Sequence, residues 1–252
     1  MSSKPRSSRT KASNSNPLQG RVALITGGSK GIGFAISRAF ASRGATVVLT
    51  GRDEQALSAA TAQITGGGGE ALSRHCDVAS AESVAGLFVA LRKQFGTLDL
   101  VVNNAGIAGP TASVDQLSLD AWREIIDTNL TGTFLVTRAA LPLMRRGGTI
   151  VNNLSVAAKG TFPGMSAYVA SKHGALGFTA TLREELRPRG IRVISLIPGA
   201  TDTAIWRQFW PEAPRERMMS PESVAEALVA AVLLPENASV DELVISPAAG
   251  TL

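Results

Sequence analysis

The stretch Val-Ala-Leu-Ile-Thr-Gly-Gly-Ser-Lys-Gly-Ile-Gly, residues 22–33, decides the fold. Its first four residues form a short apolar run, which predicts a buried strand. The run leads directly into a glycine-rich turn, and helical periodicity follows as far as Phe40, before Gly44. A strand, a glycine turn and a helix in this order predict the start of a parallel βαβ unit.

The same alternation of strand and helix continues along the chain. Short apolar runs predict strands over 22–25, 46–50, 71–76, 98–102, 149–154, 191–197 and 243–245. Helical periodicity predicts helices over 53–64, 80–95, 119–144, 168–186 and 224–233, the last capped by Ser220 with Pro221 at its first position. Because the strands are apolar throughout, we expect an α/β fold with one parallel sheet and helices on both faces.

Length and composition fit one large domain. The 252 residues are 44% hydrophobic, enough for a well-buried core, and no linker or internal repeat divides them. A single cysteine, Cys76, excludes an intrachain disulfide and fits a reducing compartment, so we expect a cytoplasmic location. The apolar runs are far shorter than the roughly 18 residues of a membrane span, so no membrane association is expected.

The basic excess of the chain lies in its N-terminal tail. The net charge is +5, and the four basic residues among the first 20, which include no acid, are Lys4, Arg6, Arg9 and Lys11. Without these four, 21 basic residues face 20 acidic ones. We therefore expect residues 1–17 to be a disordered basic tail and residues 18–252 to form the domain, with no nucleic-acid role. An organelle transit peptide is the alternative for the tail.

The glycines Gly27, Gly31 and Gly33 predict a phosphate-binding turn. Glycines let the backbone approach a pyrophosphate closely, and the helix N-terminus supplies unpaired N–H groups and positive potential. Lys30 supports this interpretation, because a cation at a helix N-terminus is disfavoured unless an anion lies there. An ordinary glycine-rich turn is the alternative.

The end of the second strand indicates which nicotinamide cofactor is used. Enzymes that prefer NAD usually carry an acid here, which binds the ribose 2′-hydroxyl. This chain has Thr50-Gly51-Arg52 instead, and Arg52 with Lys30 would face a 2′-phosphate. We therefore expect NADP(H) to be preferred over NAD(H), with a solvated Arg52 as the alternative.

Two further loops follow strands at the same expected edge of the sheet. Asp77 follows the third strand and is suited to accept a hydrogen bond from an adenine amino group, although an ordinary turn or N-cap residue is the alternative. Asn103-Asn104-Ala105-Gly106 follows the fourth strand. Its small residues permit close approach of a ribose, and its amides can brace neighbouring loops.

Tyr168 and Lys172 form the candidate catalytic pair. Four residues apart on a helix, they lie on one face, one turn from each other. A phenol has a pKa of about 10 in water, and a nearby ammonium lowers it. A tyrosine so placed can act as a general acid or base, whereas a surface pair on an amphipathic helix is the alternative. Ser155, just past the fifth strand, lies 13 residues before Tyr168.

Taken together, the motifs resemble the short-chain dehydrogenase/reductase family in its single-domain form. The motifs occur in order as Thr26-Gly27-xxx-Gly31-x-Gly33, Asn103-Asn104-Ala105-Gly106, Asn129, Ser155, Tyr168-xxx-Lys172 and Pro198-Gly199. The resemblance covers the chain from about Leu18 to the C-terminus. It implies a three-layer Rossmann-type, doubly wound sheet of about seven strands.

The resemblance also implies roles for four catalytic residues. Tyr168 would exchange a proton with the substrate oxygen, and Lys172 would lower the pKa of Tyr168 and hold the nicotinamide ribose. Ser155 would hydrogen-bond the substrate carbonyl. Asn129 would help hold a water that links Lys172 to solvent.

The cofactor-binding residues that we expect come from the turn, the strand ends and the catalytic helix. They are Gly27, Ser29, Lys30, Gly31, Ile32, Gly33, Arg52, Asp77, Val78, Asn104, Ala105, Gly106, Tyr168, Lys172, Pro198, Gly199, Thr201 and Thr203, the last two near the nicotinamide carboxamide.

The segment that follows, over 204–219, carries Trp206, Phe209 and Trp210. These three aromatic residues predict a substrate lid, with packing of the loop onto the core as the alternative.

Two features depart from the relatives that reduce acyl-carrier-protein substrates. The chain ends Asp-Glu-Leu-Val-Ile-Ser-Pro over 241–247 rather than with a glycine-rich turn, which argues against such a substrate. Asn153-Leu154 replaces the more usual Ile-Ser before the catalytic serine, which we expect to affect only local packing. The two histidines, His75 and His173, are isolated, so no metal site is expected.

These residues predict an oxidoreductase that acts on an alcohol/carbonyl pair with NADP(H). A nucleotide-binding regulatory protein, or an epimerase or dehydratase on the same fold, is the alternative. The expected partners are a small-molecule substrate and further copies of the chain in a homotetramer, with a dimer as the alternative.

Overall fold

The computed structural model describes residues 16–250. The predicted disordered tail lies outside this range except for Asn16 and Pro17, as do the last two residues of the predicted domain. The core of the described part begins at Leu18, whose side chain is fully buried and whose N–H donates to Arg43 O at 2.9 Å.

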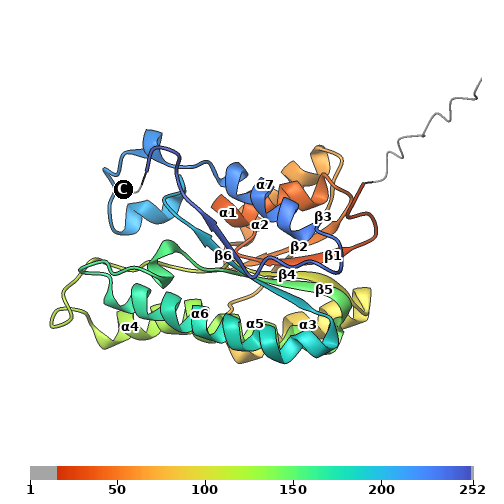
Figure 1. Ribbon diagram of the computed structural model, residues 1–252, viewed down its shortest axis with the longest axis horizontal. Helices are drawn as coiled ribbons and strands as arrows, with labels where there is room; N and C mark the ends of the chain where they lie inside the picture. Colours follow the sequence, from red (N-terminus) through yellow and green to blue (C-terminus); the bar gives the residue numbers. More distant parts are fainter. Residues whose placement is uncertain (1–15, 251–252) are drawn as a thin grey trace, which may run out of the picture.

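In the described part of the chain, seven strands form one parallel sheet in the order β3-β2-β1-β4-β5-β6-β7 (Figure 1). The strands are β1 Val22–Thr26, β2 Thr46–Gly51, β3 Glu70–His75, β4 Leu98–Asn103, β5 Met144–Asn153, β6 Arg192–Pro198 and β7 Glu242–Ile245. The strand order reverses between β1 and β4, and ligands bind at the carboxyl ends of strands beside such a reversal. The predicted doubly wound α/β fold is confirmed.

Helices cover both faces of this sheet. They are α1 Gly31–Ala41, α2 Glu54–Gly66, α3 Ala81–Phe95, α4 Leu119–Ile126, α5 Gly132–Ala140, α6 Ser166–Leu186 and α7 Pro221–Val232. Figure 1 shows α1, α2 and α7 on one face and α3, α4, α5 and α6 on the other. Ser80 and Ser220 cap α3 and α7, since each side chain accepts a hydrogen bond from the N–H three residues on.

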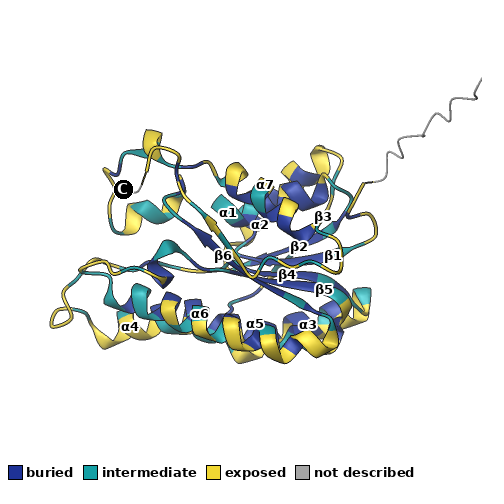
Figure 2. Ribbon diagram, in the orientation of Figure 1, coloured by how far each residue is buried: buried dark blue, intermediate teal, exposed yellow. Residues whose placement is uncertain are grey.

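The central strands are buried on both sides because their residues alternate between two cores, whereas the edge strands β3 and β7 are partly exposed. In β1, Ala23 and Ile25 pack in the core beneath α1, α2 and α7, while Leu24 packs in the core beneath α3, α5 and α6. Figure 2 shows buried strands between helices whose outer surfaces are exposed. This double burial explains the continuously apolar strands of the sequence.

The prediction of one helix over 119–144 is wrong in two places. A π-helical turn, Asp127–Thr131, separates α4 from α5, and such turns often occur at functional sites. The second error is at the end, where a 3₁₀ turn over Leu141–Leu143 closes α5 and β5 already begins at Met144. Pro142 explains this end, because its ring would clash with the carbonyl four residues back in a continued α-helix. In β5 the register shifts between its pairings at Met144 and Thr149.

A buried amide network joins the centre of the sheet to the helices below it. Asn103 Nδ2 donates to Thr137 Oγ1 at 2.9 Å and to Asn152 Oδ1 at 2.8 Å. Asn152 Nδ2 in turn donates to Thr179 Oγ1 at 2.8 Å. All four side chains are almost fully buried, so these bonds satisfy groups that water cannot reach.

We expect Asn152→Ala to lower the free energy of unfolding by about 1–3 kcal/mol, because it leaves a buried N–H of Asn103 without an acceptor. Urea unfolding measures this change. Thr65→Ala, at an exposed helix position, is the matched control and should stay within about 0.5 kcal/mol of wild type. Equal midpoints for the two variants would show that the network contributes nothing.

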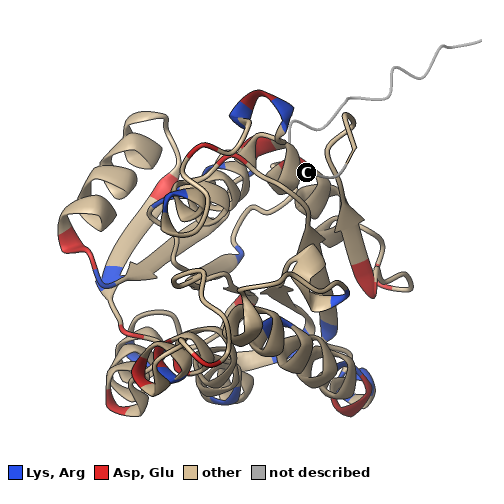
Figure 3. Ribbon diagram, turned by 90° about the vertical axis from the view of Figure 1, so that its left-hand side faces the viewer, with Lys and Arg blue, Asp and Glu red and all other residues tan. Residues whose placement is uncertain are grey.

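Acidic and basic residues are interspersed around the outside of the molecule (Figure 3). None of the helices in residues 16–250 combines the length and the apolar character that a membrane crossing needs.

Candidate active site

A cavity of about 640 Å³ opens at the carboxyl ends of β1, β4, β5 and β6. It is the place at which the strand order predicts a ligand. Fourteen of the predicted site residues line it: Gly27, Lys30, Gly31, Ile32, Asn104, Ala105, Gly106, Ser155, Tyr168, Lys172, Pro198, Gly199, Thr201 and Thr203. Ser29, Gly33, Arg52, Asp77, Val78 and Asn129 lie outside its lining.

The glycine turn has a conformation and a crowding that larger residues would not tolerate. Gly27 and Gly31 have φ angles of 62° and 53°, in the left-handed region that favours glycine. A Cβ on Gly33 would lie 2.3 Å from both Asn104 Nδ2 and Gly27 O. Helix α1, which the turn opens, has no side-chain cap at Lys30 and no acid in its first turn. Its N-terminus therefore fits an anion such as a pyrophosphate.

Asn104 joins three strand ends beside this turn. Its Nδ2 donates to Thr26 O at 2.9 Å and to Gly27 O at 3.1 Å, while its Oδ1 accepts from Asn153 Nδ2 at 2.8 Å. The prediction that Asn153 affects only local packing is therefore wrong, because its amide holds the side chain of Asn104, which in turn bonds the start of the glycine turn.

Tyr168 and Lys172 lie in the first two turns of α6, and both side chains line the cavity. Lys172 is only 6% exposed, and its Nζ donates to Asn153 O at 3.1 Å. The same Nζ lies 5.6 Å from the centre of the Tyr168 ring. Ser155 faces the cavity from the end of β5, where its Oγ accepts from Ala157 N at 3.1 Å and opens a 3₁₀ turn over Val156–Ala158.

Burial dominates the protonation of this pair. It lowers the pKa of Lys172 to about 8, because a buried ammonium loses its hydration. It also raises the pKa of Tyr168, which the neighbouring Ser155 hydroxyl lowers to a smaller extent. The direction for Tyr168 is thus opposite to the lowering expected from Lys172. A phenol with a raised pKa is protonated at neutral pH, which is the state that a proton donor needs.

Asn129 lies in the π-helical turn and braces the site from behind. Its Oδ1 accepts from Ile107 N at 2.9 Å, and its Nδ2 donates to Ile107 O at 2.9 Å and Ser171 Oγ at 3.0 Å. Ser171 Oγ then donates to Tyr168 O at 2.7 Å. Asn129 therefore ties the loop after β4 to the catalytic helix, and its part in holding a water stays a prediction.

The residues predicted for the adenosine end have partners within the chain. Lys30 Nζ pairs with Asp53 Oδ2 at 2.8 Å, which lowers the pKa of Asp53. Asp53 therefore supplies an anion beside Lys30 at the start of α1. The presence of Lys30 alone is thus weaker evidence for a bound phosphate than the sequence suggested. Arg52 is exposed beside it. Asp77 Oδ1 accepts from Ala79 N at 3.0 Å, as an ordinary turn residue does.

The segment after β6 is fastened across the cavity at several points. Trp206 Nε1 donates to Thr201 O at 2.8 Å. Gln208 Oε1 accepts from Ala108 N at 3.0 Å and Gly109 N at 3.2 Å, in the loop after β4. Trp206, Phe209 and Trp210 of this segment line the cavity, and their part as a substrate lid stays a prediction.

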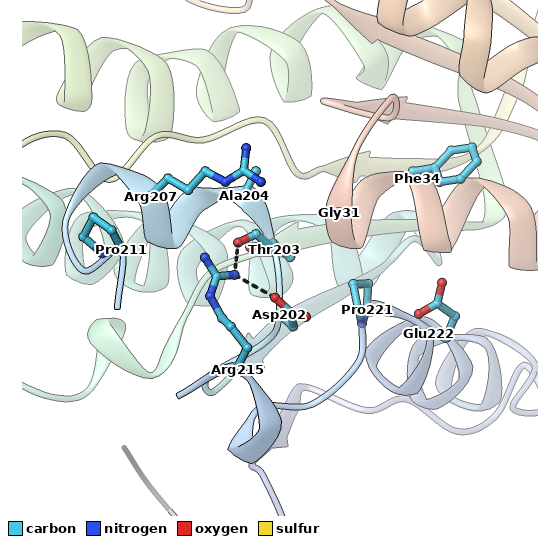
Figure 4. Close-up of a pocket in the computed structure, with 10 residues that line it drawn as sticks. All are labelled: Gly31, Phe34, Asp202, Thr203, Ala204, Arg207, Pro211, Arg215, Pro221 and Glu222. Atoms are coloured by element: carbon cyan, nitrogen blue, oxygen red, sulfur yellow. Dashed lines mark hydrogen bonds and ion pairs between the residues drawn. The ribbon is translucent and has the colours of Figure 1, made fainter. Parts of the chain in front are cut away.

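A second cavity of about 930 Å³ lies against the starts of α1 and α7 (Figure 4). It shares Gly31, Thr203 and Ala204 with the first cavity. Arg215 Nη1 donates to Asp202 Oδ1 at 2.7 Å and to Thr203 O at 2.8 Å, which fixes the strip of backbone between the two cavities.

Two residues that shape the site, Asp53 and Gln208, were not among the predicted site residues, and Asn153 was expected to affect only packing. Asp53 stands next to Arg52 and was assigned only to the start of the predicted helix over 53–64. Asn153 precedes Ser155 by two positions, where two consecutive asparagines at the end of the strand, Asn152 and Asn153, are the available sign. Gln208 has no local signal, because its partners Ala108 and Gly109 are about 100 positions away in the chain.

Comparisons with known proteins agree with this geometry. The family profile described as short chain dehydrogenase matches residues 21–214. The 3beta-hydroxysteroid dehydrogenase of Mediterraneibacter gnavus is 39% identical over 73% of this chain and 67% of its own length. The 3-oxoacyl-(acyl-carrier-protein) reductase of Synechocystis sp. is 38% identical over 82% and 87%. A short chain dehydrogenase from Burkholderia cenocepacia, crystallised in complex with NADP, is 35% identical, with a TM-score of 0.84 over 92% and 99%.

Proposed function

Because the chain belongs to the short-chain dehydrogenase/reductase family, we propose that it transfers a hydride between NADP(H) and an alcohol/carbonyl substrate, with Tyr168 as general acid and base. The observation that supports this most is one cavity that contains Ser155, Tyr168 and Lys172 together with the glycine turn of α1. A proton donor, an oxyanion partner and a nucleotide cradle are the groups that carbonyl reduction needs.

The nicotinamide supplies the hydride when the cofactor is bound. In ketone reduction, the Tyr168 hydroxyl donates its proton to the carbonyl oxygen, and the Ser155 hydroxyl hydrogen-bonds the same oxygen as negative charge develops on it. In alcohol oxidation, the Tyr168 phenolate takes the proton back. Lys172, held by Asn153 O, supplies positive charge beside the phenol and a donor for the nicotinamide ribose.

The cofactor itself would lie along the strand ends. The open N–H groups at the start of α1 would hold the pyrophosphate, and Asn104, Ala105 and Gly106 would let the ribose approach closely. Thr201 and Thr203 would contact the carboxamide. Near the adenosine ribose, Arg52 and Lys30 would bind a 2′-phosphate.

Two other functions on the same fold remain alternatives. A regulatory nucleotide-binding protein would not need three proton-handling side chains on one cavity wall, and an epimerase or dehydratase would not consume the cofactor. Loss of NADPH absorbance with a panel of ketones and aldehydes tests the proposal. Turnover supports it, whereas tight NADPH binding without turnover of any carbonyl compound supports a regulatory protein.

We expect NADPH to be preferred over NADH by at least about tenfold in kcat/KM, corresponding to roughly 1.4 kcal/mol. Arg52→Ala should remove most of this preference by weakening NADPH while leaving NADH nearly unchanged, because a 2′-hydroxyl carries no charge. The measurement is kcat/KM for both cofactors at one fixed ionic strength.

Arg92→Ala, at an exposed position on α3, is the matched control and should keep the wild-type preference. Equal values for the two cofactors in the wild type would disprove the phosphate site at Arg52 and Lys30. Since Asp53 shares Lys30, we assign the larger part of the preference to Arg52.

We also propose a homo-oligomer in the cytoplasm, with a tetramer as the expected state and a dimer as the alternative. Support comes from large apolar side chains on the outer face of α4 and α5, where Leu119, Trp122 and Phe134 are 58%, 38% and 41% exposed. A second copy would remove this surface from water. Light scattering that gave the monomer mass at micromolar concentration would contradict the proposal.

A further inference from the structure

The part of the cavity that the cofactor does not require is built almost wholly from apolar side chains. Two segments supply it: residues 154–165, between β5 and α6, and residues 205–210, in the lid. Their apolar lining residues are Leu154, Val156, Phe162, Pro163, Met165, Ile205, Trp206, Phe209 and Trp210. This wall is the surface that a substrate would contact beyond its reacting carbon.

Several polar groups along this wall are already engaged with the protein. Trp206 Nε1 donates to Thr201 O, Gln208 Oε1 accepts from two backbone N–H groups, and Thr111 Oγ1 donates to Phe209 O at 3.4 Å. Among the described residues that line the cavity, only Lys30 and Lys172 carry a charge. Lys30 pairs with Asp53, and Lys172 is buried against Asn153 O. Arg207, in the same segment as the aromatic residues, lines the second cavity instead. Among the described residues that line the first cavity, no cation is therefore free to bind an anionic group of a substrate.

Two aromatic side chains at the mouth of the cavity remain partly exposed. Phe162 is 40% exposed and Trp210 is 42% exposed, although both line the cavity. Trp210 belongs to a cluster in which the Trp206 ring centre lies 5.0 Å from that of Phe209 and 6.1 Å from that of Trp210. If these residues served only to pack the loop onto the core, their rings would be covered. Their exposed faces instead suit contact with an apolar ligand.

We propose that the substrate is a bulky, neutral and apolar ketone or secondary alcohol, alicyclic or aromatic, whose reacting oxygen is its main polar group. This inference rests on the proposed function and specifies the substrate of the same site. The reaction adds one hydride from NADPH to the carbonyl carbon and one proton from Tyr168 to the oxygen, and it yields the alcohol and NADP⁺. Keto acids are disfavoured, because a carboxylate beside this wall would lose its hydration without a partner.

A matched pair of ketones tests the inference. 4-tert-Butylcyclohexanone and 4-oxocyclohexanecarboxylate share one ring and one carbonyl but differ in the charge of the substituent. At neutral pH with saturating NADPH, we expect kcat/KM to be roughly 100-fold higher for the neutral ketone. Unsubstituted cyclohexanone serves as the reference for intact chemistry.

Substitution of Trp210 sharpens the test. Trp210→Arg places a cation at the mouth of the cavity, and its 42% exposure makes the substitution tolerable for the fold. It should reduce the ratio between the two ketones by about tenfold or more. Val89→Arg adds the same charge at a 71% exposed position on α3, outside the cavity lining, and as the control should keep the wild-type ratio.

The outcomes separate this inference from the proposed function. A wild-type enzyme that reduces the carboxylate as well as the neutral ketone overturns the inference and leaves the oxidoreductase proposal standing. If Trp210→Arg still reduced cyclohexanone but kept the wild-type ratio of kcat/KM between the neutral ketone and the carboxylate, the apolar wall around Trp210 would not contact the substrate. Failure to oxidise NADPH with all three ketones contradicts the proposed function itself.

Discussion

Replacing Tyr168 with phenylalanine should lower kcat by roughly 10²–10⁴-fold, the usual contribution of general acid–base catalysis. The phenyl ring keeps the apolar contacts of the phenol and loses only the proton that, in the proposed mechanism, passes to the substrate oxygen. NADPH affinity should therefore stay within a few-fold of wild type. Steady-state kinetics with a neutral ketone and NADPH binding by fluorescence measure the two quantities. A variant that kept more than about a tenth of kcat would show that another group donates the proton.

The chain offers a direct reporter for this residue, because Tyr168 is its only tyrosine. Ultraviolet absorbance of the phenolate therefore titrates Tyr168 alone. Since burial raises its pKa, we expect the phenol in the cofactor-free protein to ionise above its usual pKa of about 10. Reduction needs the protonated phenol and should weaken as pH rises through that pKa. Oxidation needs the phenolate and should strengthen over the same range.

Replacing Lys172 with methionine should lower both kcat, by roughly 10²-fold, and the affinity for NADPH. In the proposed mechanism the ammonium acts on both the phenol and the cofactor ribose, and methionine fills a similar volume without charge. Stopped-flow binding and steady-state rates separate the two losses. Lys93→Met, at an exposed position on α3, is the control and should change neither. If the variant kept normal cofactor affinity and only its pH profile changed, Lys172 would not bind the nicotinamide ribose.

Although Lys172→Met should lower activity, we do not expect it to lower the stability of the fold. The pKa of Lys172 is about 8 in the folded protein and 10.5 when the side chain is exposed, as in the unfolded chain, so the unfolded chain binds more protons between these values. The free energy of unfolding of the wild type therefore gains a contribution as pH rises from about 8 to about 10.5. Lys172→Met lacks this contribution, and at neutral pH it should be at least as stable as wild type. Urea unfolding at several pH values checks this sign, and a variant that unfolds more easily at neutral pH would indicate a structural role.

The repeating pattern of the chain was sufficient to predict the sheet. The first four residues of the strand Val22–Thr26 are all apolar because helices cover both faces of the sheet, and the glycine turn marks the ligand edge. Long-range contacts were not predictable in the same way. Gln208 reaches the backbone of Ala108 and Gly109, and nothing local in the sequence indicates which way its amide points.

The charge state and the partners of residues that are subject to two opposing effects were the hardest properties to predict. The sequence places Lys172 one turn from Tyr168, which suggested a lowered phenol pKa, but the burial of both groups determines the direction found. Lys30 suggested a bound anion, but the neighbouring Asp53 supplies one from the chain. In both cases the residue types were read correctly, and their burial and distances were needed to decide which effect is larger.

The measurement that tests the central claim most directly follows the hydride itself. NADPH carrying deuterium at both C4 positions is incubated with the enzyme and 4-tert-butylcyclohexanone, and the alcohol is analysed by mass spectrometry. The account predicts one deuterium on the carbinol carbon of each product molecule, with the hydroxyl proton drawn from solvent through Tyr168. Alcohol without deuterium, or cofactor that stays reduced while the ketone is altered, would contradict it.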